Sequence, residues 1–225
     1  MTTPPGEQEE VERRREARSR LGVPSIWEEP HFRDQPGQPG QPGRTAPPLP
    51  PSRSRPAALI IVALVAIAGA LLAILGAFFR GGGGWGILLV VVVAPTYEEV
   101  AKPLGILLMC ESRSRWVFAR WQIVAAAVIG AAVFSAIENL FYTHVFHPSG
   151  GPEFVRFRWT VCMALHCAAS TITGIGLARE WRRSAAEYRH FQTEKVFPFY
   201  IAAIALHGAY NGIVTILEIT HVFSF

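Results

Sequence analysis

Residues 57–79 read AALIIVALVAIAGALLAILGAFF, a run of 23 residues without a single charge. At 1.5 Å per residue, a helix of this length is about 34 Å long, enough to cross a hydrocarbon core of about 30 Å. The run therefore predicts a membrane-spanning helix and, with it, a membrane protein.

Four more apolar segments follow, and unlike the first they contain ionisable residues in their interiors. Their predicted ranges are 85–110, 116–146, 159–178 and 196–222. Together with residues 57–79 they predict an all-α, polytopic membrane helix bundle of about five transmembrane helices. We expect residues 57–225 to form one transmembrane domain.

Residues 1–56 have a different composition. They hold 9 of the 21 Lys and Arg residues, 8 of the 17 Asp and Glu residues and 12 of the 17 prolines, and residues 35–43 repeat Gln-Pro-Gly three times. Such a stretch buries too little apolar surface to offset the entropy of ordering the chain. It predicts a disordered tail rich in Pro, Gly and charge.

Composition also excludes some classes of protein. The net charge is +4, but outside the tail the basic residues lie mostly between apolar segments, which argues against a nucleic-acid partner and for a lipid bilayer. The three cysteines, Cys110, Cys162 and Cys167, are an odd number within apolar stretches, so they do not indicate a disulfide framework.

The positive charges between the segments predict the orientation. If the tail is cytoplasmic, the inner side carries eleven Lys and Arg residues when only the last three arginines of the tail are counted with the loops, and the outer side carries three, namely Arg80, Arg156 and Arg158. Cytoplasmic loops carry the excess of Lys and Arg in membrane proteins. We therefore expect a multi-pass protein of the cell membrane with a cytoplasmic N-terminus and an exterior C-terminus.

The second to fifth segments contain polar residues at depths where lipid is expected. These are Glu98, Glu99, Lys102, Glu138, Asn139, His166, His207 and Asn211. Each ionised group costs about 2.5–3.5 kcal/mol at bilayer depth, so three glutamates and a lysine would cost about 10 kcal/mol if they faced lipid. We expect them to face one another or a water-filled cavity, in the outer half of the membrane.

Helical spacing permits this arrangement. Glu98 and Lys102 are four residues apart and share a helix face, as do His207 and Asn211. Each group alone has a structural explanation, such as an ion pair or a hydrogen bond between helices. Their occurrence on four different segments favours a functional site.

Carboxylates and imidazoles in a partly dry cavity are suited to the activation of water. A glutamate can act as a general base, and imidazole with carboxylate can hold Zn²⁺ with one position left for water. Asn211 could donate a hydrogen bond to an oxyanion. The His-Glu-x-x-His and Gly-x-Ser-x-Gly motifs are absent, and Asp34 is the only aspartate, which excludes thermolysin-like, serine and aspartyl proteases.

Four motifs on successive segments resemble the PrsW family of intramembrane proteases, within the wider superfamily of CAAX-prenyl proteases and bacteriocin-processing proteins. They are Glu98-Glu99-x-x-Lys102, Phe134-x-x-x-Glu138-Asn139, His166 in the next segment, and His207-x-x-x-Asn211. The resemblance covers about residues 85–215.

The resemblance implies an intramembrane endopeptidase that hydrolyses a peptide bond in a membrane-anchored protein, an anti-sigma-factor-like substrate cut on the exterior side. It implies Glu98 or Glu99 as the base that activates water, Lys102 in the same catalytic cluster, and Asn211 assisting the oxyanion. Glu138, His166 and His207 would be zinc ligands or electrostatic partners, and a metal-independent glutamate mechanism stays open. A proton- or ion-coupled transporter and a non-catalytic membrane scaffold are the alternatives, because buried Glu, Lys and His also form proton relays.

Overall fold

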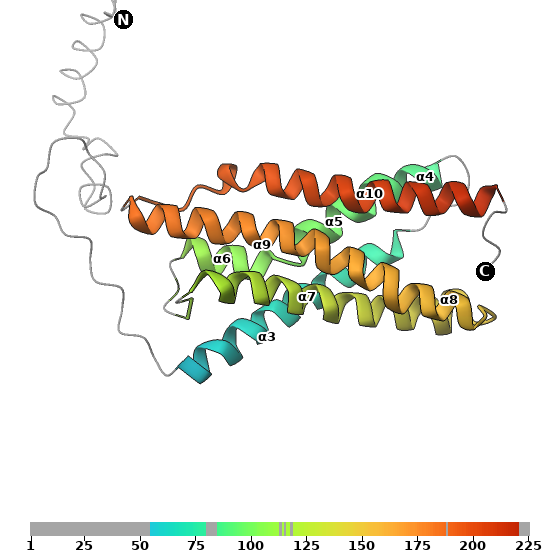
Figure 1. Ribbon diagram of the computed structural model, residues 1–225, viewed down its shortest axis with the longest axis horizontal. Helices are drawn as coiled ribbons and strands as arrows, with labels where there is room; N and C mark the ends of the chain where they lie inside the picture. The colour runs from blue at the N-terminus through green and yellow to red at the C-terminus, as the bar shows by residue number, and fades with distance from the viewer. Residues whose placement is uncertain are drawn as a thin grey trace, which may run out of the picture. The chain divides into compact units, whose positions relative to one another are not determined.

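The computed structural model describes residues 55–79, 85–112, 114, 116–117, 119–187 and 189–220, and over these residues all regular structure is helical (Figure 1). The predicted disordered tail lies outside the described residues, except for Arg55 and Pro56, which begin the first helix.

The helices follow one another along the chain without an intervening strand in the described part. They are α3 (Arg55–Ala73), η1 (Ile74–Phe78), α4 (Trp85–Leu88), η2 (Leu89–Val93), α5 (Ala94–Ala101), α6 (Leu104–Glu111), α7 (Arg120–Phe141), η3 (Tyr142–Phe146), α8 (Pro152–Phe157), η4 (Arg158–Cys162), α9 (Met163–Ala186), η5 (Thr193–Lys195) and α10 (Phe197–Ile219). Three of the short elements are π-helical turns: η2 and η4 lie inside longer rods, and η3 ends the rod that begins with α7.

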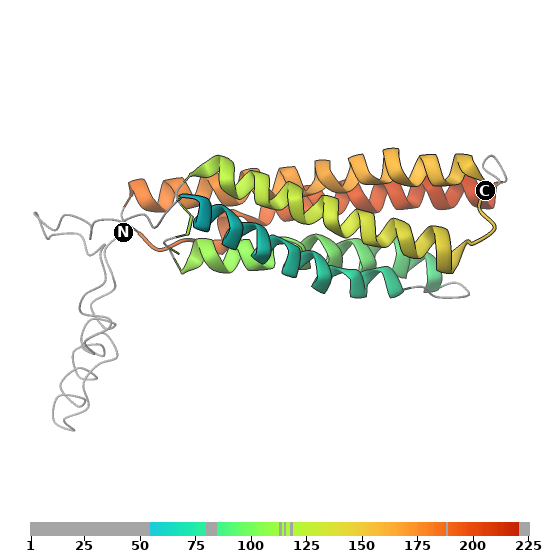
Figure 2. The same ribbon diagram turned by 90° about the horizontal axis from the view of Figure 1, so that it is seen from below.

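Four rods among the described residues are long and apolar enough to cross a membrane: Arg55–Phe78, Arg120–Phe146, Pro152–Ala186 and Phe197–Ile219. The predicted fold class, an all-α membrane helix bundle, is confirmed. The rods run roughly along one direction and form a long bundle (Figure 2).

The remaining predicted segment, residues 85–110, is present but broken. α4, η2 and α5 form one continuous rod that stops at Ala101, and α6 begins at Leu104 after a turn at Lys102 and Pro103. Proline has no N–H to donate and its ring collides with the carbonyl of the preceding turn, so it kinks or breaks a helix. The break leaves Lys102 buried at the C-terminal end of α5.

Small residues let the helices approach closely. α7 packs along α9 and α3, and α10 packs against α9 and η2. A Cβ atom on Gly130 of α7 would lie 3.1 Å from the carbonyl oxygen of Ala66 in α3, and a Cβ on Gly174 of α9 would lie 3.0 Å from the Cβ of Ala127. Close contact between small residues is the usual basis of helix packing in membranes.

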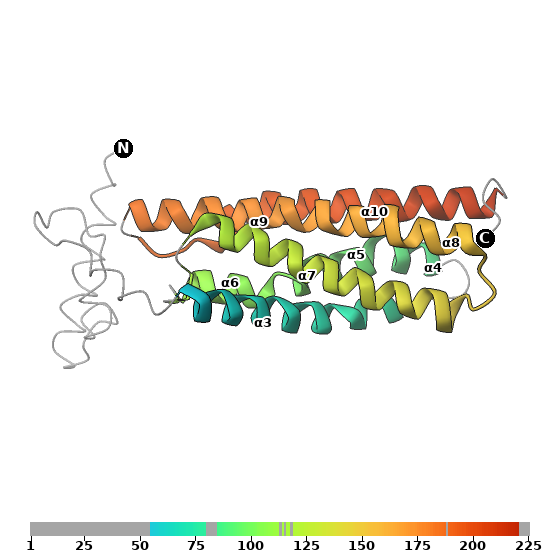
Figure 3. The same cartoon turned by 60° about the horizontal axis from the view of Figure 1, so that its bottom comes forward.

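The outward faces of the helices carry large exposed apolar side chains, among them Ile60, Leu64, Ile213 and Ile216. Most of the polar residues singled out in the sequence are buried instead, and Phe134 is completely buried as well. The buried polar residues are Glu98, Glu99, Lys102, Glu138, Asn139, His166 and His207. α4, α8 and the C-terminal end of α10 lie together at one end of the bundle, and α6 lies toward the other (Figure 3).

Candidate active site

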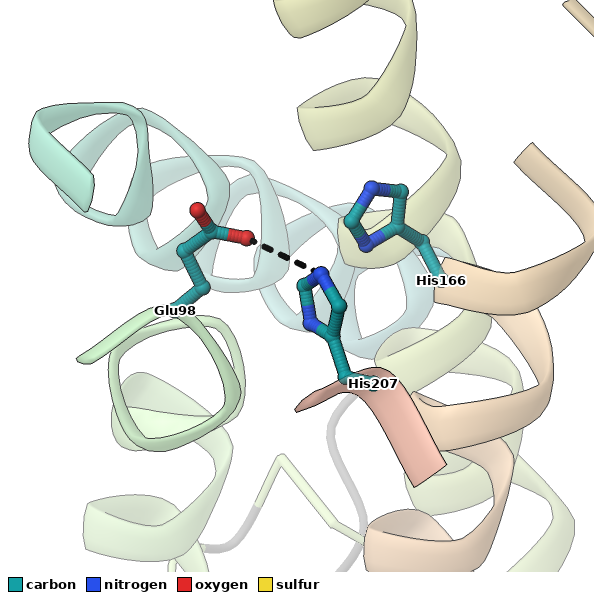
Figure 4. A group of neighbouring side chains, drawn as sticks. All are labelled: Glu98, His166 and His207. Carbon is teal, nitrogen blue, oxygen red and sulfur yellow. Dashed lines mark ion pairs between the residues drawn. The ribbon is translucent and has the colours of Figure 1, made fainter. Parts of the chain in front are cut away.

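Six of the seven predicted site residues meet in the interior of the bundle. Glu98 and Glu99 come from α5, Lys102 from the turn that follows it, Glu138 from α7, His166 from α9 and His207 from α10. Each is at most 6% exposed. Figure 4 shows Glu98, His166 and His207 pointing toward one another from three different helices.

Lys102 lies at the centre of this group. Its Nζ donates a hydrogen bond to Oε1 of Glu99 at 2.7 Å and another to Nδ1 of His166 at 3.0 Å, and it lies 3.9 Å from Oε2 of Glu98. The ammonium also sits 4.2 Å from the centre of the Phe134 ring. One buried cation therefore links two carboxylates, an imidazole and an aromatic face.

The hydrogen bonds determine which nitrogen of His166 carries the proton. A lysine ammonium only donates, so Nδ1 of His166 accepts. The neutral ring then has its proton on Nε2, and this nitrogen lies 3.1 Å from Oε2 of Glu138, which accepts it. Both nitrogens of His166 are engaged.

His207 has the opposite arrangement. Its Nδ1 lies 2.9 Å from Oε1 of Glu99, an acceptor, so Nδ1 carries the proton. Its Nε2 keeps a lone pair and lies 3.9 Å from Oε2 of Glu98, across the gap marked in Figure 4. The rings of His166 and His207 meet edge to face with their centres 4.7 Å apart.

Glu98 has one carboxylate oxygen without a hydrogen-bond partner in the described part of the chain, as Glu99 does through its own Oε2. Oε2 of Glu98 is buried and has no hydrogen-bond partner among the described residues. The helix end at Gly76 closes over the side chain, since a Cβ atom there would lie 2.5 Å from Cγ of Glu98. A buried carboxylate oxygen without a partner is costly unless water, a proton or a cation meets it.

Arg158 joins the site although its position in the sequence did not predict this. Its Nη2 lies 2.7 Å from Oε2 of Glu138, and its Nε donates to Oδ1 of Asn139 at 3.0 Å. Counted as an outer-loop charge in the sequence, Arg158 begins the π-helical turn η4 and faces inward. The available signal was its spacing, because Arg158, Cys162 and His166 follow one another at intervals of four residues.

Asn211 lies one turn beyond His207 but makes a different contact from the one we expected. Its Nδ2 donates to the carbonyl oxygen of Val90 at 2.9 Å, within the π-helical turn η2. This bond ties α10 to the rod that carries Glu98. An asparagine amide has a second N–H, which leaves one donor for another partner.

A cavity of about 360 Å³ reaches the cluster. Glu98, Glu138, His166 and His207 line it together with Arg158. Residues at the end of the bundle that holds α4 and α8 also line it, including Phe79, His147, Phe154 and Glu218. The site is therefore in contact with a space that can hold several water molecules.

Three residues have the chemistry and spacing of a metal site. Glu98, His166 and His207 each offer a ligand atom, and these atoms lie within 4.8 Å of one another. Two histidines and a glutamate are a common catalytic zinc set, and Nδ1–H of His207 already donates to a carboxylate, as metal-bound histidines usually do. This set contains Glu98 in place of the predicted Glu138, because Glu138 is occupied by Arg158 and His166.

Metal binding at these three residues would require His166 to lose a hydrogen bond. His166 uses both nitrogens, so it could bind an ion only by giving up Lys102 or Glu138 as a partner. The unpartnered oxygen of Glu98 and the free Nε2 of His207 need no such change. The donor set therefore suits Zn²⁺ after a rearrangement of His166.

Comparison with known proteins agrees with this geometry. The family model described as the PrsW family intramembrane metalloprotease matches residues 53–225. The chain belongs to the PrsW family. It is therefore a multi-pass membrane protein and an intramembrane protease, as the four motifs predicted. No curated protein and no solved structure gives a significant match.

Proposed function

We propose that this PrsW-family protein hydrolyses a peptide bond in a membrane-anchored protein with a water molecule activated by Glu98 and His207. The proposal rests on two hydrogen-bond acceptors that lie close together in residues lining the cavity, Oε2 of Glu98 and Nε2 of His207. Oε2 of Glu98 lacks a hydrogen bond to the described residues, and it lies 3.9 Å from Nε2 of His207.

A separation of 3.9 Å is too long for a direct hydrogen bond and suits a bridging water. A water that donates one hydrogen to each acceptor keeps its oxygen lone pairs free for a carbonyl carbon. Glu99 also has an Oε2 without a partner among the described residues, but it is less suited as the base, because it does not line the cavity and its Oε1 is held by both Lys102 and His207.

The residues can carry both proton transfers of the reaction. As the water oxygen bonds to the carbonyl carbon, Oε2 of Glu98 takes a proton and the carbonyl electrons move onto the oxygen. Glu98 then returns the proton to the amide nitrogen, the C–N bond breaks, and an acid and an amine are released. A positioned general base contributes about 10²–10⁴-fold to such a rate.

Asn211 lines the cavity one turn from His207, and its second N–H is the donor that could meet the oxyanion. Zn²⁺, if bound, would be held by Glu98, His166 and His207 and would supply a Lewis acid and a more acidic water. The zinc mechanism and the metal-independent glutamate mechanism use the same side chains. Whether proteolytic activity requires a metal ion therefore distinguishes them.

Substrates would approach from the end of the bundle where the cavity lining includes Phe79, His147 and Phe154. The distribution of Lys and Arg supports an exterior position for this end. We therefore propose a cut on the exterior side of a single-pass or membrane-proximal protein. An anti-sigma-factor-like substrate stays a prediction from the family resemblance.

The test is cleavage of a panel of single-pass membrane proteins, tagged at both ends and reconstituted with the enzyme in lipid vesicles. We expect wild type to cleave at least one, and Glu98→Gln to lower the rate by at least about 10²-fold because the base is lost. His207→Ala should have a similar effect. Glu187→Gln is the matched control, because it removes a carboxylate that is 44% exposed at the end of α9.

Cleavage that survives Glu98→Gln, or a wild type that cleaves no member of the panel, would contradict the proposal. Ion flux without cleavage would favour the transporter alternative. Loss of cleavage with a chelator and recovery with Zn²⁺ would select the zinc form, whereas activity that ignores chelators and still requires Glu98 would select the glutamate form.

A further inference from the structure

We infer that Arg158 is a positioning residue of this site, which holds Glu138 and thereby fixes the orientation and tautomer of His166. The expected effect of Arg158 on the rate of proteolysis rests on the proposed function. Its expected effect on His166 rests on the geometry alone.

The first step is the anchoring of Arg158 itself. Its guanidinium lies 3.8 Å from the centre of the Tyr142 ring, and its Nε donates to Oδ1 of Asn139. In return, Nδ2 of Asn139 donates to the carbonyl oxygen of Arg158 at 3.0 Å. Asn139 thus holds both the backbone and the side chain of Arg158.

The second step is the contact with Glu138. Oε2 of Glu138 accepts from Nη2 of Arg158 at 2.7 Å and from Nε2 of His166 at 3.1 Å. One carboxylate oxygen therefore joins the arginine to the histidine. The arginine side chain is 12% exposed, so little water competes for the pair.

The third step is the chain of hydrogen bonds that continues from His166. Its Nδ1 accepts from Lys102, Lys102 donates to Glu99, and Glu99 accepts from His207. With its Nε2–H held by Glu138, His166 offers only a lone pair to Lys102. Loss of the arginine would remove the bond that holds Glu138 in place, so the acceptor of the Nε2–H of His166 would no longer be fixed.

Charge supports the same conclusion. Three buried glutamates, Glu98, Glu99 and Glu138, share the interior with Lys102 and Arg158. If all are ionised, the net charge of this group is −1 with Arg158 and −2 without it. Removing Arg158 would therefore leave Glu138 without the cation that holds it beside His166.

The test combines kinetics with nitrogen-15 solid-state NMR of histidine-labelled protein in bilayers, with His166 assigned by the His166→Asn variant. In wild type we expect a neutral His166 with the proton on Nε2. In Arg158→Gln we expect the hydrogen bond from Nε2–H of His166 to weaken, so that the His166 signals shift and both neutral tautomers are populated. We also expect kcat to fall about 10–100-fold with KM unchanged, as for other residues that orient a catalytic histidine.

Two variants complete the design. Arg158→Lys keeps a cation near Glu138 but loses the bond to Asn139, so it should recover part of kcat and of the wild-type spectrum. Arg156→Gln removes an exposed arginine two residues away and should change neither.

Unchanged His166 signals and kcat in Arg158→Gln would overturn the inference. A raised KM with normal kcat would also overturn it, in favour of substrate binding, and lower thermal stability with a normal spectrum would indicate a purely structural ion pair. The NMR result does not depend on proteolysis, so failure of the proposed function would be distinguishable.

Discussion

The ammonium of Lys102 has three ionisable neighbours and little contact with solvent. It lies 2.7 Å from Oε1 of Glu99, 3.0 Å from Nδ1 of His166 and 3.9 Å from Oε2 of Glu98, and the side chain is 1% exposed. Removing one partner from a buried ion pair is strongly destabilising, because the other charge is left without compensation.

We therefore expect Lys102→Met, which keeps the length of the side chain and removes its charge, to lower the free energy of unfolding by about 3–5 kcal/mol. The measurement is denaturant or thermal unfolding in detergent micelles. Lys195, the other lysine of the chain, is exposed at the end of η5, and Lys195→Met is the control. Equal stability of the two variants would show that Lys102 does not compensate the glutamates.

Single residues illustrate how far the sequence allows a site to be predicted. Spacing correctly identified Lys102 as a partner for a carboxylate, but Glu99 is closer to it than Glu98, because α5 ends at Ala101 and Lys102 lies in a turn. Arg158 was missed because a charge at the end of an apolar segment looks like a loop residue. Its inward direction depends on Asn139 and Glu138, which come from another helix.

At the scale of the helices, the π-helical turns are the elements that shape the site. η2, η3 and η4 all contribute residues to the cavity wall, including Val90, Tyr142 and Arg158. Two of them are held by side-chain amides, through Asn211 to the carbonyl of Val90 and through Asn139 to the carbonyl of Arg158. Such turns occur often at functional sites.

Gly208 is where α10 meets η2 most closely. A Cβ atom at Gly208 would collide with the backbone carbonyl oxygen of Val91, which a change of rotamer cannot relieve. We expect Gly208→Ala to push α10 away from η2, move His207 from Glu98 and Glu99, and lower both proteolytic activity and the unfolding temperature. The measurements are the vesicle cleavage assay and thermal unfolding.

Gly212 provides the matched control, one turn further along α10. A Cβ atom there would lie 3.7 Å from the nearest atom, a methyl carbon of Val91, which is an ordinary contact. Because alanine is favoured over glycine in a helix by about 1 kcal/mol, Gly212→Ala should be neutral or stabilising. If both variants behave alike, close approach at Gly208 is not what positions His207.

Helices themselves were predictable to different degrees. Length and composition predicted the four long rods, because a predominantly apolar run of about 20 residues has few other stable states in a membrane. The break at Lys102 and Pro103 follows from proline, although the predicted segment 85–110 ran through it. The π-helical turns depend on contacts with neighbouring helices, and no local pattern in the sequence indicates them.

At the scale of the whole molecule, the cavity and the basic residues lie toward different ends of the bundle. The cavity wall includes His147 and Phe154, near the loop between α7 and α8, whereas Arg179, Arg182 and Arg183 lie in the last turns of α9. The sequence predicted that titratable groups from separate segments would share a pocket. It could not predict that Oε2 of Glu98 and Oε2 of Glu99 lack hydrogen-bond partners among the described residues, because that depends on the register of four helices.

This separation makes membrane orientation measurable. If the excess of Lys and Arg is cytoplasmic, the loop at residues 147–151 lies outside the cell and the C-terminal end of α9 lies inside. We expect a membrane-impermeant maleimide to label Ser149→Cys on intact cells, and Ala186→Cys only after the cells are permeabilised. Both positions are exposed in the structure.

Wild type is the blank for this experiment, because Cys110 and Cys162 are buried and Cys167 is half-buried. The expected pattern would mean that the cavity faces the exterior, so that substrates are cut on their extracellular side. The reverse pattern, with Ala186→Cys labelled on intact cells, would place the same cavity toward the cytoplasm. Proteolysis could then still occur, but its substrates would have to present their cytoplasmic side.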